Sequence, residues 1–251
     1  MAGGDRKRRG RRGFEGLTVE QRGERRRPMK KGTLLILVLC LCWRAAGSEP
    51  PATEQVPEAP VNVEEALARL EARMSAVQTL QSGFVQEKRL AILEQPLVLK
   101  GTIFMEKPSL FAWHVRKPVR YSMVIRDEVV RQWDEDTQRV QTISLSKNPA
   151  FKTAIRQMRG WFSGAYKSIL AEYEVTVLGE APISLKFIPR QGGFATEVIE
   201  SVMVVFESDE SYIREMHIAE RGGDSTLLTF VDTLLNAPIE PSAWKVEPRV
   251  R

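Results

Sequence analysis

Cysteine and histidine are both scarce in this chain of 251 residues, which has two of each. Cys40 and Cys42 lie in one short apolar segment near the N-terminus, so the rest of the chain can form no disulfide and no cysteine-based nucleophile or metal site. His114 and His217 stand far apart, and no G-x-S-x-G, H-E-x-x-H or phosphate-binding glycine loop is present. We therefore expect no catalytic residue, no cofactor and no enzymatic activity.

The chain also lacks an apolar run long enough to cross a membrane. The run 33–43 covers about half of the roughly 20 residues that a spanning helix needs. Met29-Lys30-Lys31 precedes it and small residues follow it, which is the pattern of a secretory signal peptide cleaved after Gly47. We predict a signal peptide over 29–47 and interpret the arginine-rich residues 1–28 as an over-called start or a disordered basic tail.

Positive charge is concentrated in the part that this cleavage would remove. Residues 1–47 hold 13 of the 37 Lys and Arg and 4 of the 32 Asp and Glu, so residues 48–251 hold 24 and 28 and carry a net charge of −4. The formal charge of +5 for the whole chain therefore indicates neither a nucleic-acid partner nor an acidic one. Residues 48–62 are rich in Pro and Glu and are predicted to form a flexible linker, and 63–251 have the length of one domain.

Alternation of apolar and polar residues, typical of β-strands, dominates from Ser82 onward. It predicts roughly eleven strands: 84–89, 97–105, 109–115, 119–125, 129–133, 139–145, 173–178, 183–188, 198–206, 212–219 and 226–231. Helical periodicity occurs over 63–77, where Asn62 can cap the start, and over 148–164. The predicted fold is mainly β with α: a large curved antiparallel sheet, an unclosed half-barrel, covered by amphipathic helices. Its apolar interior would suit a hydrophobic ligand.

The most informative segment is GTIFMEKPSLFAWHVRKP, residues 101–118. Pro108 cannot donate to a ladder, so it marks the start or the edge of a strand. Phe111 and Trp113 share one face of the strand that follows, which suits either an ordinary core or a cavity for acyl chains. Lys107 precedes the proline, and a basic cluster follows at Arg116, Lys117 and Arg120.

This segment, the sequence QSGFVQEK (81–88) and the order of the elements resemble LolA, the family of outer-membrane lipoprotein carriers. The resemblance covers about residues 63–246 and is densest at 80–133. It implies an unclosed β-barrel covered by helices, with a cavity that accepts the acyl chains of a lipoprotein. It further implies a periplasmic monomer that receives its cargo from an inner-membrane ABC transporter and passes it to an outer-membrane acceptor.

The resemblance also suggests roles for particular residues. Lys107 stands where an arginine usually precedes the proline of the motif and matters for accepting or handing on cargo. Phe111 corresponds to an aromatic residue associated with transporter contact. The residues expected to bind or gate cargo are Lys107, Phe104, Phe111, Trp113, Phe151, Ile155, Met158 and Phe162. The residues expected to contact a partner are Phe111, Arg116, Lys117 and Arg120.

Two departures from the family pattern leave the identity of the cargo open. Lys107 keeps the charge of the arginine but not its planar fork, and the chain stops soon after Trp244, without the longer C-terminal segment of some members. One alternative is a carrier of another lipid or a glycolipid. Another is a module that senses lipids or lipoproteins, although no second domain is present to report binding. No metal site is expected, because the acidic turn 134–136 lacks further ligands.

Overall fold

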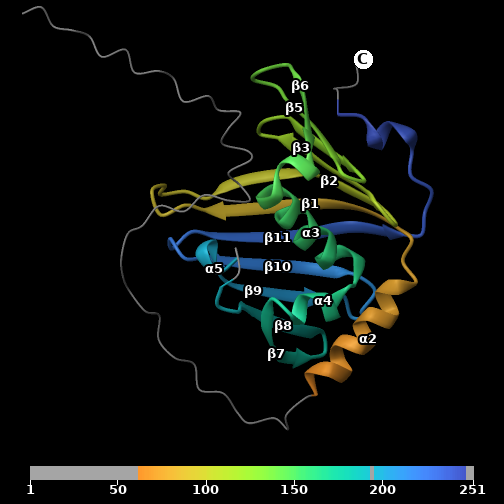
Figure 1. Cartoon of the computed structure of the whole chain (residues 1–251), viewed down its shortest axis with the longest axis vertical. Helices are drawn as coiled ribbons and strands as arrows, with labels where there is room; N and C mark the ends of the chain where they lie inside the picture. The colour runs from red at the N-terminus through yellow and green to blue at the C-terminus, as the bar shows by residue number, and fades with distance from the viewer. Residues whose placement is uncertain (1–61, 193–194, 247–251) are drawn as a thin grey trace, which may run out of the picture. The chain divides into compact units, whose positions relative to one another are not determined.

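Eleven strands form a single antiparallel sheet in this computed structural model, which describes residues 62–192 and 195–246 (Figure 1). The strands are β1 (Thr79–Arg89), β2 (Leu97–Glu106), β3 (Leu110–Lys117), β4 (Tyr121–Arg126), β5 (Val129–Asp134), β6 (Val140–Ser144), β7 (Tyr173–Glu180), β8 (Ile183–Pro189), β9 (Ile199–Phe206), β10 (Ile213–Glu220) and β11 (Ser225–Leu235). Their order in the sheet is β6-β5-β4-β3-β2-β1-β11-β10-β9-β8-β7, so β6 and β7 are its two edges. The sheet is unclosed, which confirms the predicted half-barrel. The predicted basic tail, the signal peptide and linker residues 48–61 lie outside the described residues.

Helices cover one face of this sheet. They are α2 (Val63–Ser75), α3 (Pro149–Ser163), α4 (Tyr166–Leu170) and α5 (Ala195–Val198), with short 3-10 turns η1 (Leu145–Lys147) and η2 (Pro241–Trp244). Figure 1 shows α3 and α4 in front of the strands and α2 beside the end of β7, where contacts join the two. Asn62 caps α2 as predicted, its Oδ1 accepting from the Glu64 and Glu65 amides at 3.0 and 3.4 Å. The two predicted helices are thus confirmed, whereas α4 and α5 were not predicted.

Strict alternation of burial along β1 explains how the sheet carries its core. Leu80, Phe84 and the polar Ser82 between them are buried, while the intervening Gln81 and Gly83 are half-exposed. The apolar sides of α2 and α3 meet the same sheet face, so one large hydrophobic cluster fills the space between helices and strands.

Three helices meet at Met74, in the last turn of α2. The Tyr166 hydroxyl of α4 donates to the Met74 sulfur at 2.9 Å. Gly164 ends α3 with a left-handed φ of 81° and lies directly against the same residue. A Cβ added at Gly164 would stand 2.7 Å from the Met74 Cβ, which is closer than carbon atoms can approach.

Replacing Gly164 by alanine is therefore expected to lower the free energy of unfolding by about 2 kcal/mol or more. The left-handed conformation costs an L-residue about 1–2 kcal/mol, and the collision with Met74 adds to it. Gly160, inside α3, provides the matched control: its added Cβ would meet only Ile169 at 3.8 Å, an ordinary contact. Gly160→Ala should gain about 1 kcal/mol from helix propensity. Urea unfolding measures both changes, and equal effects of the two variants would contradict the close packing at Met74.

The outer face of the sheet carries a second, smaller cluster made with the C-terminal segment. Val246 is buried against Trp133, and the Trp244 ring lies 6.4 Å from the Phe104 ring. His114 links the segment to the sheet: its Nε2 donates to the Ala243 carbonyl at 2.7 Å. Its Nδ1 lies 2.9 Å from the Ser122 hydroxyl, which donates to it in this tautomer.

Acid is expected to loosen this attachment. Burial, and secondly the charge of Arg116, lower the pKa of His114 from its ordinary value, while the bond to Ala243 opposes them. As the pH falls, His114 is protonated in the unfolded chain before it is protonated in the folded protein. The free energy of unfolding is therefore unaffected by this group above about pH 6.5 and decreases as the pH drops below that value. His114→Gln, which keeps a donor toward Ala243, should lose less of its melting temperature between pH 7 and pH 5 than the unmodified protein. His217→Gln, at an exposed position, is the control, and the same pH dependence in all three proteins would contradict the prediction.

Candidate functional site

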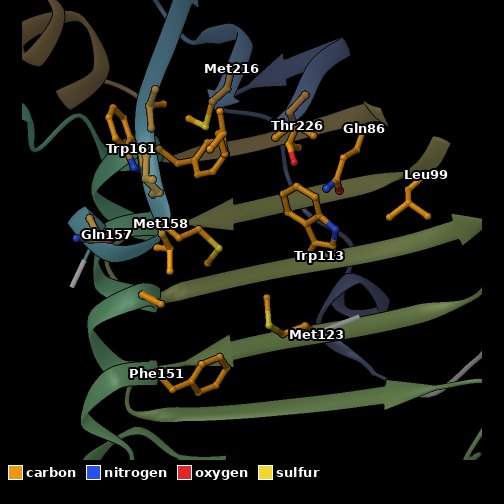
Figure 2. A pocket seen from close by; sticks show the side chains of 18 of the residues that line it. Gln86, Leu99, Trp113, Met123, Phe151, Gln157, Met158, Trp161, Met216 and Thr226 are labelled. Carbon is orange, nitrogen blue, oxygen red and sulfur yellow. The ribbon is translucent and has the colours of Figure 1, made fainter. Parts of the chain in front are cut away.

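A cavity of about 170 Å³ lies between α3 and the helix-covered face of the sheet. Figure 2 shows Phe151 and Met158 of α3 on the side of the cavity opposite Trp113 and Met123. Further walls come from β1, β2, β10 and β11 and from the segment that contains α5. None of the described residues that line the cavity is charged. The described lining therefore suits an apolar group, and it presents no charged group for acid–base chemistry.

Helix α3 supplies one wall of the cavity. Phe151, Met158 and Phe162 line the cavity. Ile155 shares their side of the helix but is buried in the core and does not line the space. The helix thus combines anchoring side chains with others that face the cavity.

The aromatic residues of β3 form the opposite wall. Trp113 lines the cavity, and the ring of Phe84 lies 4.3 Å from it. Phe84 can take this place because Gly101 has no side chain: a Cβ there would stand 2.6 Å from the Phe84 ring. Phe111 is buried beneath, its ring 6.4 Å from Trp113 and 5.6 Å from Phe162. A chain of aromatic contacts therefore connects the sheet to α3.

The tyrosines of the cavity report a poorly hydrated interior. Burial, followed by the charge of Glu172, raises the pKa of Tyr173 to about 12. Burial also raises the pKa of Tyr121, whose hydroxyl donates to Gln132 at 3.1 Å. Such a medium favours neutral, apolar ligands and opposes the entry of charge.

Lys107 does not enter the cavity but holds one of the helices that border the core. Its Nζ donates to the Met74 carbonyl at 2.7 Å, at the C-terminal end of α2 where the helix dipole favours a cation. Partial burial lowers the pKa of Lys107 from its ordinary value. Two residues on, the Ser109 carbonyl accepts from Arg159 of α3 at 2.8 Å. The β2–β3 turn, residues 107–109, therefore fastens both α2 and α3.

Phe104 requires a correction. We expected it among the cargo-binding residues, but its side chain lies on the outer face, with its ring 5.8 Å from His114 and 6.4 Å from Trp244. The neighbours Ile103 and Met105 are the buried residues on the helix-covered face. Because side chains alternate along β2, Phe104 points to the other face of the sheet from Ile103 and Met105. Phe104 therefore does not line the cavity.

The basic residues expected to meet a partner lie outside the cavity. Arg116 Nε donates to the Thr102 hydroxyl at 3.3 Å, and Lys117 is exposed. Arg120 pairs with Glu135 at 3.1 Å and lies over the Trp133 ring at 5.9 Å. Phe111, by contrast, is only 1% exposed. The structure thus separates Phe111 from the three basic residues, and their partner role stays a prediction.

Several lining residues escaped the sequence reasoning. They are Gln86, Leu99, Tyr121, Met123, Trp161, Met216, Thr226 and Leu228, among others. Apart from Trp161, which lies on α3, the apolar ones stand at alternate positions of predicted strands, so a choice of the inward face would have found them. Gln86 and Thr226 gave no such signal, because polar residues are normally assigned to the outside.

Comparison with known proteins gives this architecture a family. The family described as "Outer membrane lipoprotein carrier protein LolA" matches residues 75–247. The chain belongs to the LolA family. A curated relative, the outer-membrane lipoprotein carrier protein of Hahella chejuensis (strain KCTC 2396), is 24% identical over 172 residues, which are 68% of this chain and 78% of that protein. The resemblance drawn from the sequence is thereby confirmed.

Solved structures similar to this LolA-family chain are distant in sequence. An uncharacterized conserved protein from Thermus thermophilus has a TM-score of 0.46 and 13% identity, covering 74% of this chain and 94% of its own. A LolA superfamily protein from Nitrosomonas europaea has a TM-score of 0.41 and 8% identity, covering 74% and 98%. The lipoprotein LppX of Mycobacterium tuberculosis has a TM-score of 0.41 and 11% identity, covering 71% and 99%.

Proposed function

We propose that this LolA-family protein is a periplasmic carrier that binds the acyl chains of lipoproteins in its cavity and shuttles them from the inner to the outer membrane. The observation that supports this most is the uncharged cavity beneath α3, lined by aromatic, methionine and aliphatic side chains. Each acyl methylene that leaves water for such a site contributes about 0.8 kcal/mol. Methionine side chains adapt to flexible ligands, which suits cargo of variable chains.

Uptake requires α3 to move. The cavity of about 170 Å³ is smaller than the roughly 300–1,000 Å³ typical of sites for small molecules. The β2–β3 turn holds the closed arrangement through Lys107 and Arg159. Closure of an emptied cavity would then favour release, so that cargo can leave for a hydrophobic acceptor.

The partners follow from the same proposal. An inner-membrane ABC transporter would load the carrier and an outer-membrane acceptor would unload it, with the predicted signal peptide directing the chain to the periplasm. Within residues 62–192 and 195–246, no helix has the length and apolar character to cross a membrane. Phe111 is buried under α3, so a partner would reach it only after that helix has moved.

A transfer assay between vesicles tests the proposal. Donor vesicles carry a fluorescent triacylated lipopeptide, and acceptor vesicles are held behind a membrane that only the protein can cross. We expect transfer to increase with the concentration of the protein. Transfer of a phospholipid but not of the lipopeptide would favour a carrier of another lipid, and transfer of neither would contradict a carrier role.

A further inference from the structure

A buried amide faces the cavity without a hydrogen-bond partner among the described residues. Gln86 of β1 is 4% exposed, lines the cavity, and makes no hydrogen bond through its amide with any residue that the structure describes (Figure 2). Three other polar lining residues are engaged: Tyr121 binds Gln132, Gln157 binds a carboxylate at 2.6 Å, and Thr226 donates to a glutamate at 3.4 Å. Buried amides are normally hydrogen-bonded, so an amide directed into an apolar cavity indicates a partner from outside the chain.

The surroundings of Gln86 are apolar within its own row of the sheet. Leu99 of β2 and Leu228 of β11 stand directly opposite it, and Met216 of β10 follows Leu228. All three line the cavity. An apolar residue at position 86 would complete this row, and the amide interrupts it.

Polarity rises in steps along the inward side of β1. Phe84 lies opposite Phe230, in the aromatic part of the core. Gln86 comes next, and then Lys88, which is 5% exposed and pairs with Glu220 at 3.0 Å. The sequence of aromatic, amide and charged side chains matches an amphiphile that lies with its chain toward Phe84 and its head group toward Lys88.

We propose that Gln86 donates a hydrogen bond to the ester or amide carbonyl that joins an acyl chain to its head group. The inference rests on the proposed carrier function and deepens it, because it makes the linkage, and not only the chain, part of what the cavity recognises. The carboxamide has two N–H donors and one acceptor oxygen, so it can serve an ester carbonyl as a donor and an amide linkage as both donor and acceptor. A hydrocarbon chain without a carbonyl would leave the amide unpaired.

The test compares two lipids that differ only in this group. 1-Monopalmitoylglycerol contains an ester, and 1-O-hexadecylglycerol has the same chain and head group joined by an ether. The dissociation constants of both are measured for the full domain by displacement of a fluorescent fatty-acyl probe. We expect the unmodified protein to prefer the ester about tenfold, in line with one hydrogen bond. Gln86→Leu should lose this preference while binding the ether at least as well.

Retained ether binding shows that the Gln86→Leu variant is folded. Gln81→Leu is the matched control: it is the same substitution on the same strand, but Gln81 does not line the cavity and its amide donates to the Pro238 carbonyl at 2.9 Å, so the preference should stay unchanged. Equal binding of both lipids by the unmodified protein, or an ester preference that survives Gln86→Leu, would overturn the inference while leaving the carrier function intact. Failure of both lipids to bind would overturn the carrier function and the inference with it. A third probe, N-hexadecanoylethanolamine, indicates the source: tighter binding than the ester favours the amide-linked chain of a lipoprotein, weaker binding an ester lipid.

Discussion

Replacing Ala154 by tryptophan is expected to weaken acyl binding strongly while the domain stays folded. Ala154 lines the cavity from α3, so an indole at this position occupies space that the cargo needs. Displacing three or four methylenes at about 0.8 kcal/mol each weakens binding by roughly a hundredfold. Titration of a fluorescent acyl probe into the purified variant measures the loss.

The control for this variant places the same indole on the other side of the same helix. The Arg156 side chain is 66% exposed and pairs only at the surface with Glu172. Arg156→Trp should therefore bind the probe as the unmodified protein does, because an exposed ion pair contributes little. Unchanged binding by Ala154→Trp, or an equal loss in both variants, would contradict the assignment of the cavity as the acyl site.

Lys107→Leu is expected to trap cargo. The bond from Lys107 to the Met74 carbonyl exists in the closed arrangement, and a cavity of this size must open to hold an acyl chain. Lys107 holds the end of α2 at Met74, against which Gly164 at the end of α3 packs. Removing the bond weakens this support of α3 in the closed state, so the loaded state becomes relatively more stable. A hydrogen bond from a charged group contributes about 1.5–3 kcal/mol. Because Lys107 is partly exposed, we expect a value at the lower end of this range, which corresponds to cargo binding about tenfold tighter. Release to acceptor vesicles should slow by a similar factor.

Lys107→Arg distinguishes the role of the charge from that of the residue. Arginine keeps a donor and a positive charge toward the end of α2, so this variant should release cargo at about the rate of the unmodified protein. A Lys107→Leu protein that binds and releases the lipopeptide at normal rates would contradict the proposed role of Lys107 in cargo release.

Much of the fold could be predicted because period-two alternation is local information. Strand β1 was expected to begin at Phe84 but begins at Thr79, since Ser82 is a buried polar residue and Gly83 interrupts the apolar pattern. Helix α4 was missed because it has five residues, too few for a periodicity to emerge. The order of the strands depends on pairings distant in the chain, such as Phe84 of β1 with Phe230 of β11, and it was not predicted.

The site was less predictable than the fold. Trp113 and the apolar side of α3 could be named because their aromatic and methionine residues stand out in the sequence. Phe104 was misplaced, because its own aromatic character was weighed and its position on β2 was not. Gln86 could not have been found, since only the burial imposed by β2 and β11 on either side makes its amide exceptional.

Native mass spectrometry of the protein, purified from a periplasm without detergent, tests the central claim most directly. We predict a population whose mass exceeds that of the chain by one acylated ligand, and a triacylated lipoprotein as that ligand would identify the cargo. The same population should decrease strongly in Ala154→Trp and increase in Lys107→Leu. A protein that carries no ligand and takes up none from added lipopeptide or lipid would contradict the account.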